Sequence, residues 1–376
     1  MKKKILIFID WYLPGYKAGG PIRSCANLVS QMSNEFDFFI ATRDTDYMDS
    51  LPYKTIKNNS WNKLSDGSSV FYISNNALSK SSIKKIIEEV NPEIIYLNSV
   101  FSYWFTILPL IVSKKKYKVI LASRGMFASG AMAIKSFKKN IFLFFSKTFC
   151  LYSKVIFQAS SKEEEQQIAN YFPKSKIIVA PNLPRKISNS KTEIVLKSSG
   201  EARLLNIARI APEKNLLFGL EVLKNVKGKV VFDFYGPIYD NQYWDKCKIA
   251  FSNLPQNITV TYKGILNSED IFNKLNDHHF LFLPSRGENF GHIILEAMSA
   301  GMPAIISDTT PWRNLQQKNA GWDISLVKPD EFSKVIDKCV EMNNEEYELL
   351  SKGTSKLAAD YINDEGNINA NRLLFS

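Results

Sequence analysis

Short apolar runs alternate with helical patterns along the whole chain. In the first half, runs of mostly Ile, Val, Phe and Tyr predict strands at 5–10, 36–42, 69–74, 93–99, 118–123 and 154–160. Runs without polar alternation are typical of parallel sheets, which are buried on both faces. Amphipathic patterns between the runs predict helices, for example at 21–34, 79–90 and 102–115. The stretch 43–68, rich in Asp, Asn, Ser and Pro, predicts a long loop.

A second series of the same kind begins near residue 202. It predicts strands at 203–208, 230–235, 258–262, 280–284 and 303–307. Repeated strand–helix–strand units give right-handed crossovers, so the predicted fold class is α/β with two Rossmann-like, doubly wound parallel sheets. Such a pair of domains would place ligands at the carboxyl ends of both sheets, facing each other across a cleft.

Length and a polar linker indicate where the two domains divide. A chain of 376 residues exceeds the roughly 250–300 residues that one hydrophobic core supports. The segment 186–200, KISNSKTEIVLKSSG, is the best linker candidate. We therefore expect a first domain at 1–190 and a second at 200–376, with the final helix free to pack back on the first.

The positive charge is concentrated in the first half. The chain has 48 basic and 37 acidic side chains, a net charge of +11. Residues 1–190 hold 27 basic and 13 acidic side chains, and the remainder holds 21 and 24. A basic surface attracts nucleic acid, phospholipid head groups or phosphorylated substrates. A lysine-rich surface without an anionic partner is the plainer interpretation.

The segment 134–154 combines five lysines with many phenylalanines. A basic, aromatic-rich helix can lie in a membrane interface. The same pattern also fits a helix whose apolar side faces the core and whose lysines face solvent, so both interpretations stay open.

The termini and cysteines favour a cytoplasmic protein. The apolar run after Met1–Lys4 is only five residues long before Asp10, too short for a signal peptide, and no stretch approaches the roughly 20 apolar residues of a spanning helix. Four cysteines without a CxxC pair fit reduced thiols and argue against a disulfide scaffold or a zinc site. We expect a cytoplasmic location, with peripheral contact at the inner face of the plasma membrane left open.

The most informative segment is 283–312, LPSRGENFGHIILEAMSAGMPAIISDTTPW. A strand ends at Ser285, a polar loop carries Glu288, and a helix is expected from about Gly291 to Ala300, with Glu296 inside it. Backbone N–H groups at the start of a helix are a natural site for phosphate oxygens. Glycine at position 291 lets a ligand approach the backbone closely.

This segment resembles the E-x7-E signature of retaining glycosyltransferases of family 4, which have the GT-B fold. The positions that match in register are Glu288, Phe290, Gly291, Leu295, Glu296, Ala297, Met298, Gly301 and Pro303. Family members often carry Gly where this chain has Asn289. The resemblance implies transfer of a sugar from a nucleotide-sugar donor with retention, Glu296 near the donor ribose and Glu288 near the transferred sugar. Whether Glu288 positions hydroxyls or stabilises oxocarbenium-like charge stays open.

The resemblance also extends to two other places in the second half. The family has an Arg and a Lys five residues apart after the first strand, which implies that Arg209 and Lys214 clamp the donor diphosphate. Cations at a helix entrance neutralise charge on a leaving phosphate. Gly264 fits the family's strand-end glycine beside the nucleobase. Glu288, Arg209 and Lys214 are therefore the catalytic candidates, and the substrate-binding candidates here are Gly264, Asn289, Phe290, Gly291 and Glu296.

Two segments of the first half complete the candidate site. Gly19 and Gly20 form an open loop before Pro21 and a helix, and the resemblance implies that they line the cleft beside the donor phosphates and acceptor. Arg124 lies in a Ser-Arg-Gly-Met segment that resembles a bacterial surface-polysaccharide branch of the family, where it would face the donor or an anionic acceptor. Many family members carry a His near this position, and this chain has none in the first domain.

No metal site is expected. The Asp44-Thr45-Asp46 sequence matches a DxD metal pattern of another glycosyltransferase class but lies in the early loop, and His278-His279 has no acidic or Cys partner at ligand spacing. The expected ligands are a UDP- or GDP-linked sugar, a saccharide or lipid-diphosphate-linked acceptor and an anionic membrane surface, without nucleic acid or a further cofactor. The alternatives are a nucleotide-sugar epimerase of the same fold and a basic membrane- or nucleic-acid-binding protein.

Overall fold

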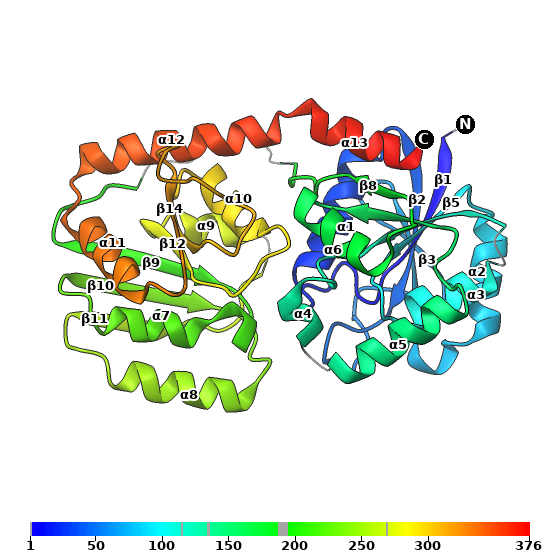
Figure 1. Cartoon of the computed structure of the whole chain (residues 1–376), viewed down its shortest axis with the longest axis horizontal. Coiled ribbons are helices and arrows are strands. Elements are labelled where there is room, and N and C mark those ends of the chain that lie inside the picture. Colours follow the sequence, from blue (N-terminus) through cyan, green and yellow to red (C-terminus); the bar gives the residue numbers. More distant parts are fainter. Residues whose placement is uncertain (1, 114–115, 134–135, 187–194, 268–269) are drawn as a thin grey trace. The chain divides into compact units, whose positions relative to one another are not determined.

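The computed structural model describes residues 2–113, 116–133, 136–186, 195–267 and 270–376. The chain divides into two compact units (Figure 1), one made of Met1–Lys186 with Glu365–Ser376 and the other of Ile187–Asp364. Most of the predicted linker, residues 187–194, lies outside the described residues. Each unit contains one sheet whose strands are almost all parallel, so the predicted α/β class with two doubly wound sheets is confirmed.

The first unit is built on an eight-stranded sheet of order β3-β4-β2-β1-β5-β6-β7-β8. All neighbours are parallel except β3, which runs antiparallel to β4. The strands are β1 (Lys3–Phe8), β2 (Phe36–Arg43), β3 (Trp61–Lys63), β4 (Ser69–Ile73), β5 (Ile94–Asn98), β6 (Lys118–Ala122), β7 (Val155–Ala159) and β8 (Ile177–Val179). The chain leaves β1 toward β2 on one side and later returns to β5 on the other, which makes β1/β5 the point where the strand order reverses.

Helices cover both faces of this sheet. Side chains alternate along β1, so Ile5 and Ile7 enter one core while Leu6 and Phe8 enter the other. The first core is completed by α1 (Gly20–Met32) and α13 (Glu365–Phe375), the second by α2 (Lys80–Val90), α3 (Leu108–Val112), α5 (Ser136–Thr148) and α6 (Lys162–Tyr171). The remaining helical segments of the unit are η1 (Asn75–Ala77), η2 (Tyr103–Ile107) and α4 (Ser129–Ala133).

The C-terminal helix α13 is part of the first unit. The Phe375 ring packs edge-on against Phe36 and Tyr96, with ring centroids 5.5 Å apart in both pairs. Asn371 donates from Nδ2 to the carbonyl of Pro181 at 2.9 Å. Apolar packing and hydrogen bonds therefore join residues from the two ends of the chain in one core.

The second unit is built on a six-stranded, fully parallel sheet of order β11-β10-β9-β12-β13-β14. The strands are β9 (Glu201–Ile207), β10 (Lys229–Tyr235), β11 (Ile258–Tyr262), β12 (Phe280–Leu283), β13 (Ala304–Ser307) and β14 (Gly321–Ile324). The helical segments are η3 (Pro212–Lys214), α7 (Leu216–Leu223), α8 (Asn241–Ser252), α9 (Ile271–Leu275), α10 (His292–Ser299), α11 (Pro329–Glu341) and α12 (Asn344–Ile362). The strand order reverses at β9, which has β10 on one side and β12 on the other.

The structure differs from the sequence-based expectation in four places. The predicted long loop 43–68 contains the short strand β3, and two further strands, β8 and β14, were not expected. The helix expected at 102–115 is a π-helical turn, η2, followed by the short helix α3. Pro109 at the start of α3 explains the break, because proline has no N–H for the helical ladder. No helix in the described part of the chain is long and apolar enough to cross a bilayer.

The buried His279, directly before β12, makes the stability of the second unit depend on pH. Its Nδ1 accepts a hydrogen bond from the backbone N–H of Arg203 at 3.1 Å, and the Arg203 guanidinium lies 3.0 Å from Nε2. Burial, aided by the positive charges of Arg203 and Lys197, lowers the pKa of His279 from 6.5 to about 4. The folded unit therefore holds this imidazole neutral.

We expect stability to fall as the pH drops from 6.5 toward 4, because the unfolded chain then binds a proton that the folded unit excludes. At pH 4.5 the loss from His279 should be about 2 kcal/mol. Calorimetric melting of the wild type and of His279→Gln at pH 7.5 and 4.5 measures it: the variant should lose less stability on acidification. An equal loss in both proteins would contradict the assignment.

Candidate active site

The strongest catalytic candidates meet at the carboxyl edge of the second sheet, where β9 and β12 end side by side. The chain leaves β9 into η3, which carries Lys214, and leaves β12 into the loop that carries Glu288. The Lys214 Nζ lies 2.6 Å from Glu288 Oε1, and the two side chains are only 17% and 11% exposed. The structure thus joins two residues that are 74 positions apart into one partly buried ion pair.

Two residues that the sequence analysis did not single out brace this edge. Asn215 donates from Nδ2 to the carbonyl of Pro284 at 3.0 Å, and its Oδ1 accepts from Arg286 Nε at 3.2 Å. The backbone N–H of Arg286 donates to the carbonyl of Glu213 at 2.9 Å. These bonds tie the η3 segment to the Glu288 loop, so the ion pair is held from both sides. The sequence offered only the residue type as a signal. In the structure Asn215 has a φ of 58°, a conformation in which Asn is enriched.

Arg209 has a different partner from Lys214. One of its guanidinium nitrogens, Nη2, lies 3.2 Å from Glu213 Oε1, and its guanidinium carbon lies 5.0 Å from the centre of the Tyr239 ring. The side chain is one-third exposed. Arg209 therefore presents a positive charge at the same edge while being oriented by a carboxylate and an aromatic ring.

The helix α10 begins directly after the Glu288 loop. Gly291 is its N-cap with a φ of 78°, which favours glycine, and it has no side chain with which to cap the helix. Asn289 is half-buried, and Glu296, one turn into α10, is almost fully buried. The Phe290 ring packs in the core against Trp312 and Tyr361, and its carbonyl accepts from Trp312 Nε1 at 2.7 Å. Phe290 therefore anchors the start of the helix with both its side chain and its carbonyl.

Gly264 follows β11, and a second glycine, Gly236, follows the neighbouring strand β10. The Gly264 carbonyl accepts from the Gly236 N–H at 2.9 Å, and a Cβ at Gly264 would meet nothing within 4 Å. A Cβ at Gly236 would lie 1.8 Å from the carbonyl oxygen of Ala208, so only glycine fits there. Gly236, which the sequence analysis missed, lets the chain after β10 approach the chain after β9.

In the first unit, Gly19 and Gly20 stand at the start of α1, where the structure leaves open space around both. The loop before them is held by Asp46. Its carboxylate accepts from the backbone N–H groups of Tyr16 at 2.9 Å, Lys17 at 3.2 Å and Tyr47 at 2.7 Å. This residue was considered above for metal binding; in the structure its carboxylate fixes the glycine-containing loop.

Arg124 lies after β6, with a φ of 52°. Its guanidinium donates to Asn98 Oδ1 at 2.8 and 3.0 Å, to Asn182 Oδ1 at 2.5 Å and to the Tyr96 hydroxyl at 2.9 Å. These partners are neutral, so they orient the guanidinium without cancelling its charge. The sequence analysis missed all three of them, because they are distant in sequence and form no recognisable spacing.

A buried carboxylate, Glu164, shapes the same turn. It accepts from Ser123 Oγ at 2.5 Å, from the Gly125 N–H at 2.6 Å and from the N–H and Oγ of Ser160 at 2.7 and 2.6 Å. Four donors satisfy this carboxylate in the interior, as buried charge requires. Glu164 therefore fixes the backbone that carries Arg124.

Asp10 follows β1 at the point where the strand order of the first sheet reverses. Its Oδ1 accepts from Ser102 Oγ at 2.9 Å. Burial raises the pKa of Asp10, and the Ser102 hydrogen bond and the Arg43 charge partly offset this.

Among the described residues, no group of three or more His, Cys, Asp and Glu side chains is arranged to hold a metal ion. His278 contacts the carbonyl of Lys274 at 2.8 Å and the carboxylate of Asp233 at 3.3 Å.

Comparisons with known proteins agree with this architecture. Residues 188–356, less than half of the chain, match the family model described as glycosyl transferases group 1. An uncharacterised 41.2 kDa protein in the cps region of Klebsiella pneumoniae is 24% identical over 227 residues. That match spans 57% of this chain and 60% of the Klebsiella protein, so less than two thirds of that relative is covered.

Solved structures resemble the chain over nearly its full length. The sucrose-phosphate synthase from Thermosynechococcus elongatus aligns with a TM-score of 0.73 at 14% identity, covering 100% of this chain and 98% of that one. Anabaena HepE, in complex with UDP-glucose, aligns with a TM-score of 0.72 at 13% identity, covering 99% and 98%. Likeness at this level of identity establishes the fold. Residues 188–356 therefore resemble group 1 glycosyl transferases, and the chain has the two-domain α/β GT-B fold.

Proposed function

We propose that this protein transfers a sugar from a nucleotide-sugar donor to a saccharide or lipid-linked acceptor. The observation that carries the proposal is the Lys214–Glu288 ion pair at the carboxyl edge of the second sheet, 2.6 Å long and largely buried. It lies within the segment that matches the glycosyl transferase model. The reversal of strand order at β9 supports the same location, because open α/β sheets bind ligands at such points.

The cations at this edge suit the chemistry of the donor. A nucleotide sugar breaks at the bond between its anomeric carbon and the diphosphate, and negative charge then develops on the departing phosphate oxygen. Lys214, Arg209 and the N-terminus of α10 would stabilise that charge through ion pairing and backbone N–H groups. In this proposal they serve in the role that a metal ion has in other transferases.

The two glutamates receive separate roles. The resemblance to family 4 retaining enzymes assigns Glu288 to the transferred sugar and Glu296 to the donor ribose. The ion pair supports the first role, because contact with Lys214 orients the Glu288 carboxylate. We propose that the sugar is transferred with retention, by attack of the acceptor on the face that the diphosphate leaves.

The first unit would hold the acceptor. Gly19 and Gly20 offer backbone with open space around it, and Arg124 offers a charge oriented by neutral partners. An acceptor bearing a phosphate or diphosphate suits a guanidinium of this kind. Similarity to a protein in the cps region of Klebsiella pneumoniae supports a role in bacterial surface-polysaccharide synthesis. For that role we propose a UDP- or GDP-linked donor and a lipid-linked acceptor. A lipid-linked acceptor would bring the enzyme to the inner face of the plasma membrane.

Replacement of the ion-pair residues tests the proposal. We expect Glu288→Gln to lower donor turnover about 10²–10³-fold while leaving UDP or GDP binding nearly unchanged, and Lys214→Ala to weaken both. Turnover is measured as nucleoside diphosphate released from UDP-glucose, UDP-N-acetylglucosamine or GDP-mannose, and binding by calorimetric titration of the free diphosphate.

Lys229→Ala is the matched control. Lys229 and Glu201 also form a 2.6 Å ion pair between neighbouring strands, but at the amino ends of β9 and β10. This variant should keep turnover within about twofold, because exposed pairs contribute little. Full turnover in Glu288→Gln and Lys214→Ala would overturn the assignment, and conversion of the donor sugar to an isomer without an acceptor would favour an epimerase.

The acceptor-side loop offers a second test. Asp46→Ala removes the acceptor of three backbone N–H groups and should cost about 1–3 kcal/mol, with faster hydrogen exchange at residues 15–20. Asp49→Ala is the control, because Asp49 pairs with the Lys17 side chain at the surface and its loss should cost less than about 1 kcal/mol. Urea unfolding and hydrogen-exchange mass spectrometry measure both effects. Equal behaviour of the two variants would refute the role given to Asp46.

A further inference from the structure

The helix α5 exposes an unusual apolar face. Large apolar side chains four, seven, eight and twelve residues after Phe137 lie on the same side of the helix as Phe137. They are Phe137, Ile141, Phe144, Phe145 and the following Phe149, which are 77%, 42%, 65%, 50% and 76% exposed. We call this set the apolar face of α5. Only a small part of α5 is buried in the core: its buried residues are Leu143 and Ser146.

Three members of this face form one continuous cluster. The Phe144 and Phe145 rings meet edge-on at 5.6 Å between centroids, and Phe145 stacks on Phe149 at 6.3 Å. Single exposed apolar residues are ordinary, but a contiguous exposed cluster marks an interaction surface. Of the two interpretations left open by the sequence, the structure therefore disfavours a helix whose phenylalanines all face the core.

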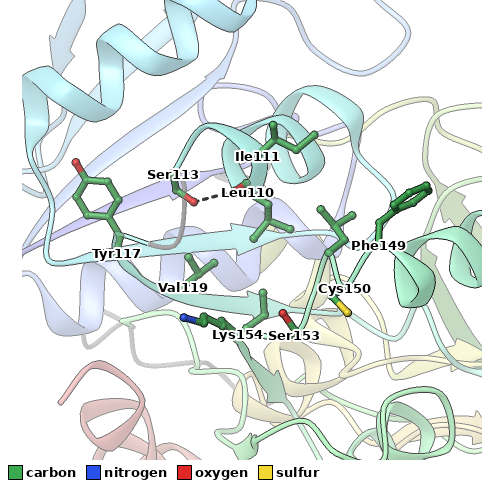
Figure 2. Close-up of a pocket in the computed structure, with 11 residues that line it drawn as sticks. Leu110, Ile111, Ser113, Tyr117, Val119, Phe149, Cys150, Ser153 and Lys154 are labelled. Atoms are coloured by element: carbon green, nitrogen blue, oxygen red, sulfur yellow. Dashed lines mark hydrogen bonds between the residues drawn. The ribbon is translucent and has the colours of Figure 1, made fainter.

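A pocket of about 240 Å³ continues this surface inward. Figure 2 shows Leu110 and Ile111 of α3 and Val119 of β6 around it, together with Phe149, Cys150, Ser153 and Lys154. The lining is mostly apolar, with the Lys154 ammonium group as its cation. Phe149 belongs to both the apolar face and the pocket, and Ile111 on the pocket wall is itself 49% exposed.

The chain segment that carries this face has charge of one sign. Residues 94–162 contain 11 Lys and Arg side chains and no Asp or Glu. This span includes α3, α5 and the pocket, and Lys138 and Lys154 are among its exposed residues. An apolar face carried by an acid-free, lysine-rich segment is complementary to a bilayer, whose interface offers acyl chains beneath anionic head groups.

We propose that the apolar face of α5 and the adjoining pocket dock on a bilayer that contains anionic phospholipid. The phenylalanine rings enter the acyl region, the lysines pair with head-group phosphates, and the pocket accepts part of a displaced acyl chain. Val119 and Val155 place the pocket at the amino ends of β6 and β7, the opposite edge from Arg124 and Gly19. This docking goes beyond the proposed function and holds whether or not the chain transfers a sugar.

Flotation of the full-length chain with vesicles tests the proposal without donor or acceptor. The vesicles are pure phosphatidylcholine, or phosphatidylcholine with 30% phosphatidylglycerol, in 0.1 and 0.5 M NaCl. We expect binding to the anionic vesicles that is weaker on neutral vesicles and at high salt. The variant Phe144→Ser/Phe145→Ser should bind at least about tenfold more weakly, and Lys138→Gln/Lys154→Gln should lose most of the preference for phosphatidylglycerol.

The matched control is Ile249→Ser/Leu349→Ser. These two residues of the second unit are 64% and 65% exposed, so the control removes a comparable apolar area elsewhere. It should bind as the wild type does. Unchanged melting temperatures and donor turnover in all three variants would exclude misfolding as the cause of lost binding.

Three results would overturn the proposal: no binding to anionic vesicles, equal loss in the control, or a wild type that is dimeric without lipid and becomes monomeric in Phe144→Ser/Phe145→Ser. The last would assign the apolar face to a second copy of the chain, and analytical ultracentrifugation would reveal it. Because vesicle binding and donor turnover are measured separately, loss of one does not decide the other.

Discussion

Burial of both faces of each parallel sheet is the constraint on which the rest of the structure depends. Successive side chains of β1 and β9 enter different cores, so the middle residues of each strand pack against apolar side chains on both faces of the sheet. Polar chemistry is then confined to strand ends and to the loops that follow. Where the strand order reverses, at β1/β5 and at β9/β12, neighbouring loops diverge and leave room for a ligand. Asp10 and Ser102 occupy the first of these points, and Lys214 and Glu288 the second.

Each candidate group is held by neighbours that have no direct chemical role. Asn215 and Arg286 join the segments that carry Lys214 and Glu288, and Ser307 and Thr309 both donate to the carbonyl of Ser285 at the base of the same loop. In the first unit, Asp46 and Glu164 use their carboxylates to fix backbone. Because these groups are already oriented, binding of a ligand does not require additional free energy to order the charged site.

The sequence predicted those features that depend on strong local patterns. The long, doubly buried strands were found because their apolar runs are unmistakable, whereas β3, β8 and β14 are edge strands of three or four residues with little pattern to detect. Glu288 and Lys214 were proposed from a motif, and the structure pairs their side chains. The partners of Arg124 and the brace from Asn215 depend on contacts between distant segments, which no spacing encodes. For α5, the sequence pattern fitted both a membrane interface and a helix that faces the core. The exposure of its phenylalanines in the structure distinguishes the two.

The central claim is that the second unit binds the diphosphate of a nucleotide sugar at the Lys214–Glu288 edge. Hydrogen–deuterium exchange of the full-length chain, with and without saturating UDP or GDP, tests it most directly. One of the two nucleotides should slow exchange both in residues 207–216 and in residues 284–296, which form the two sides of that edge. Unchanged exchange in both segments with either nucleotide, or protection confined to the first unit, would contradict the claim.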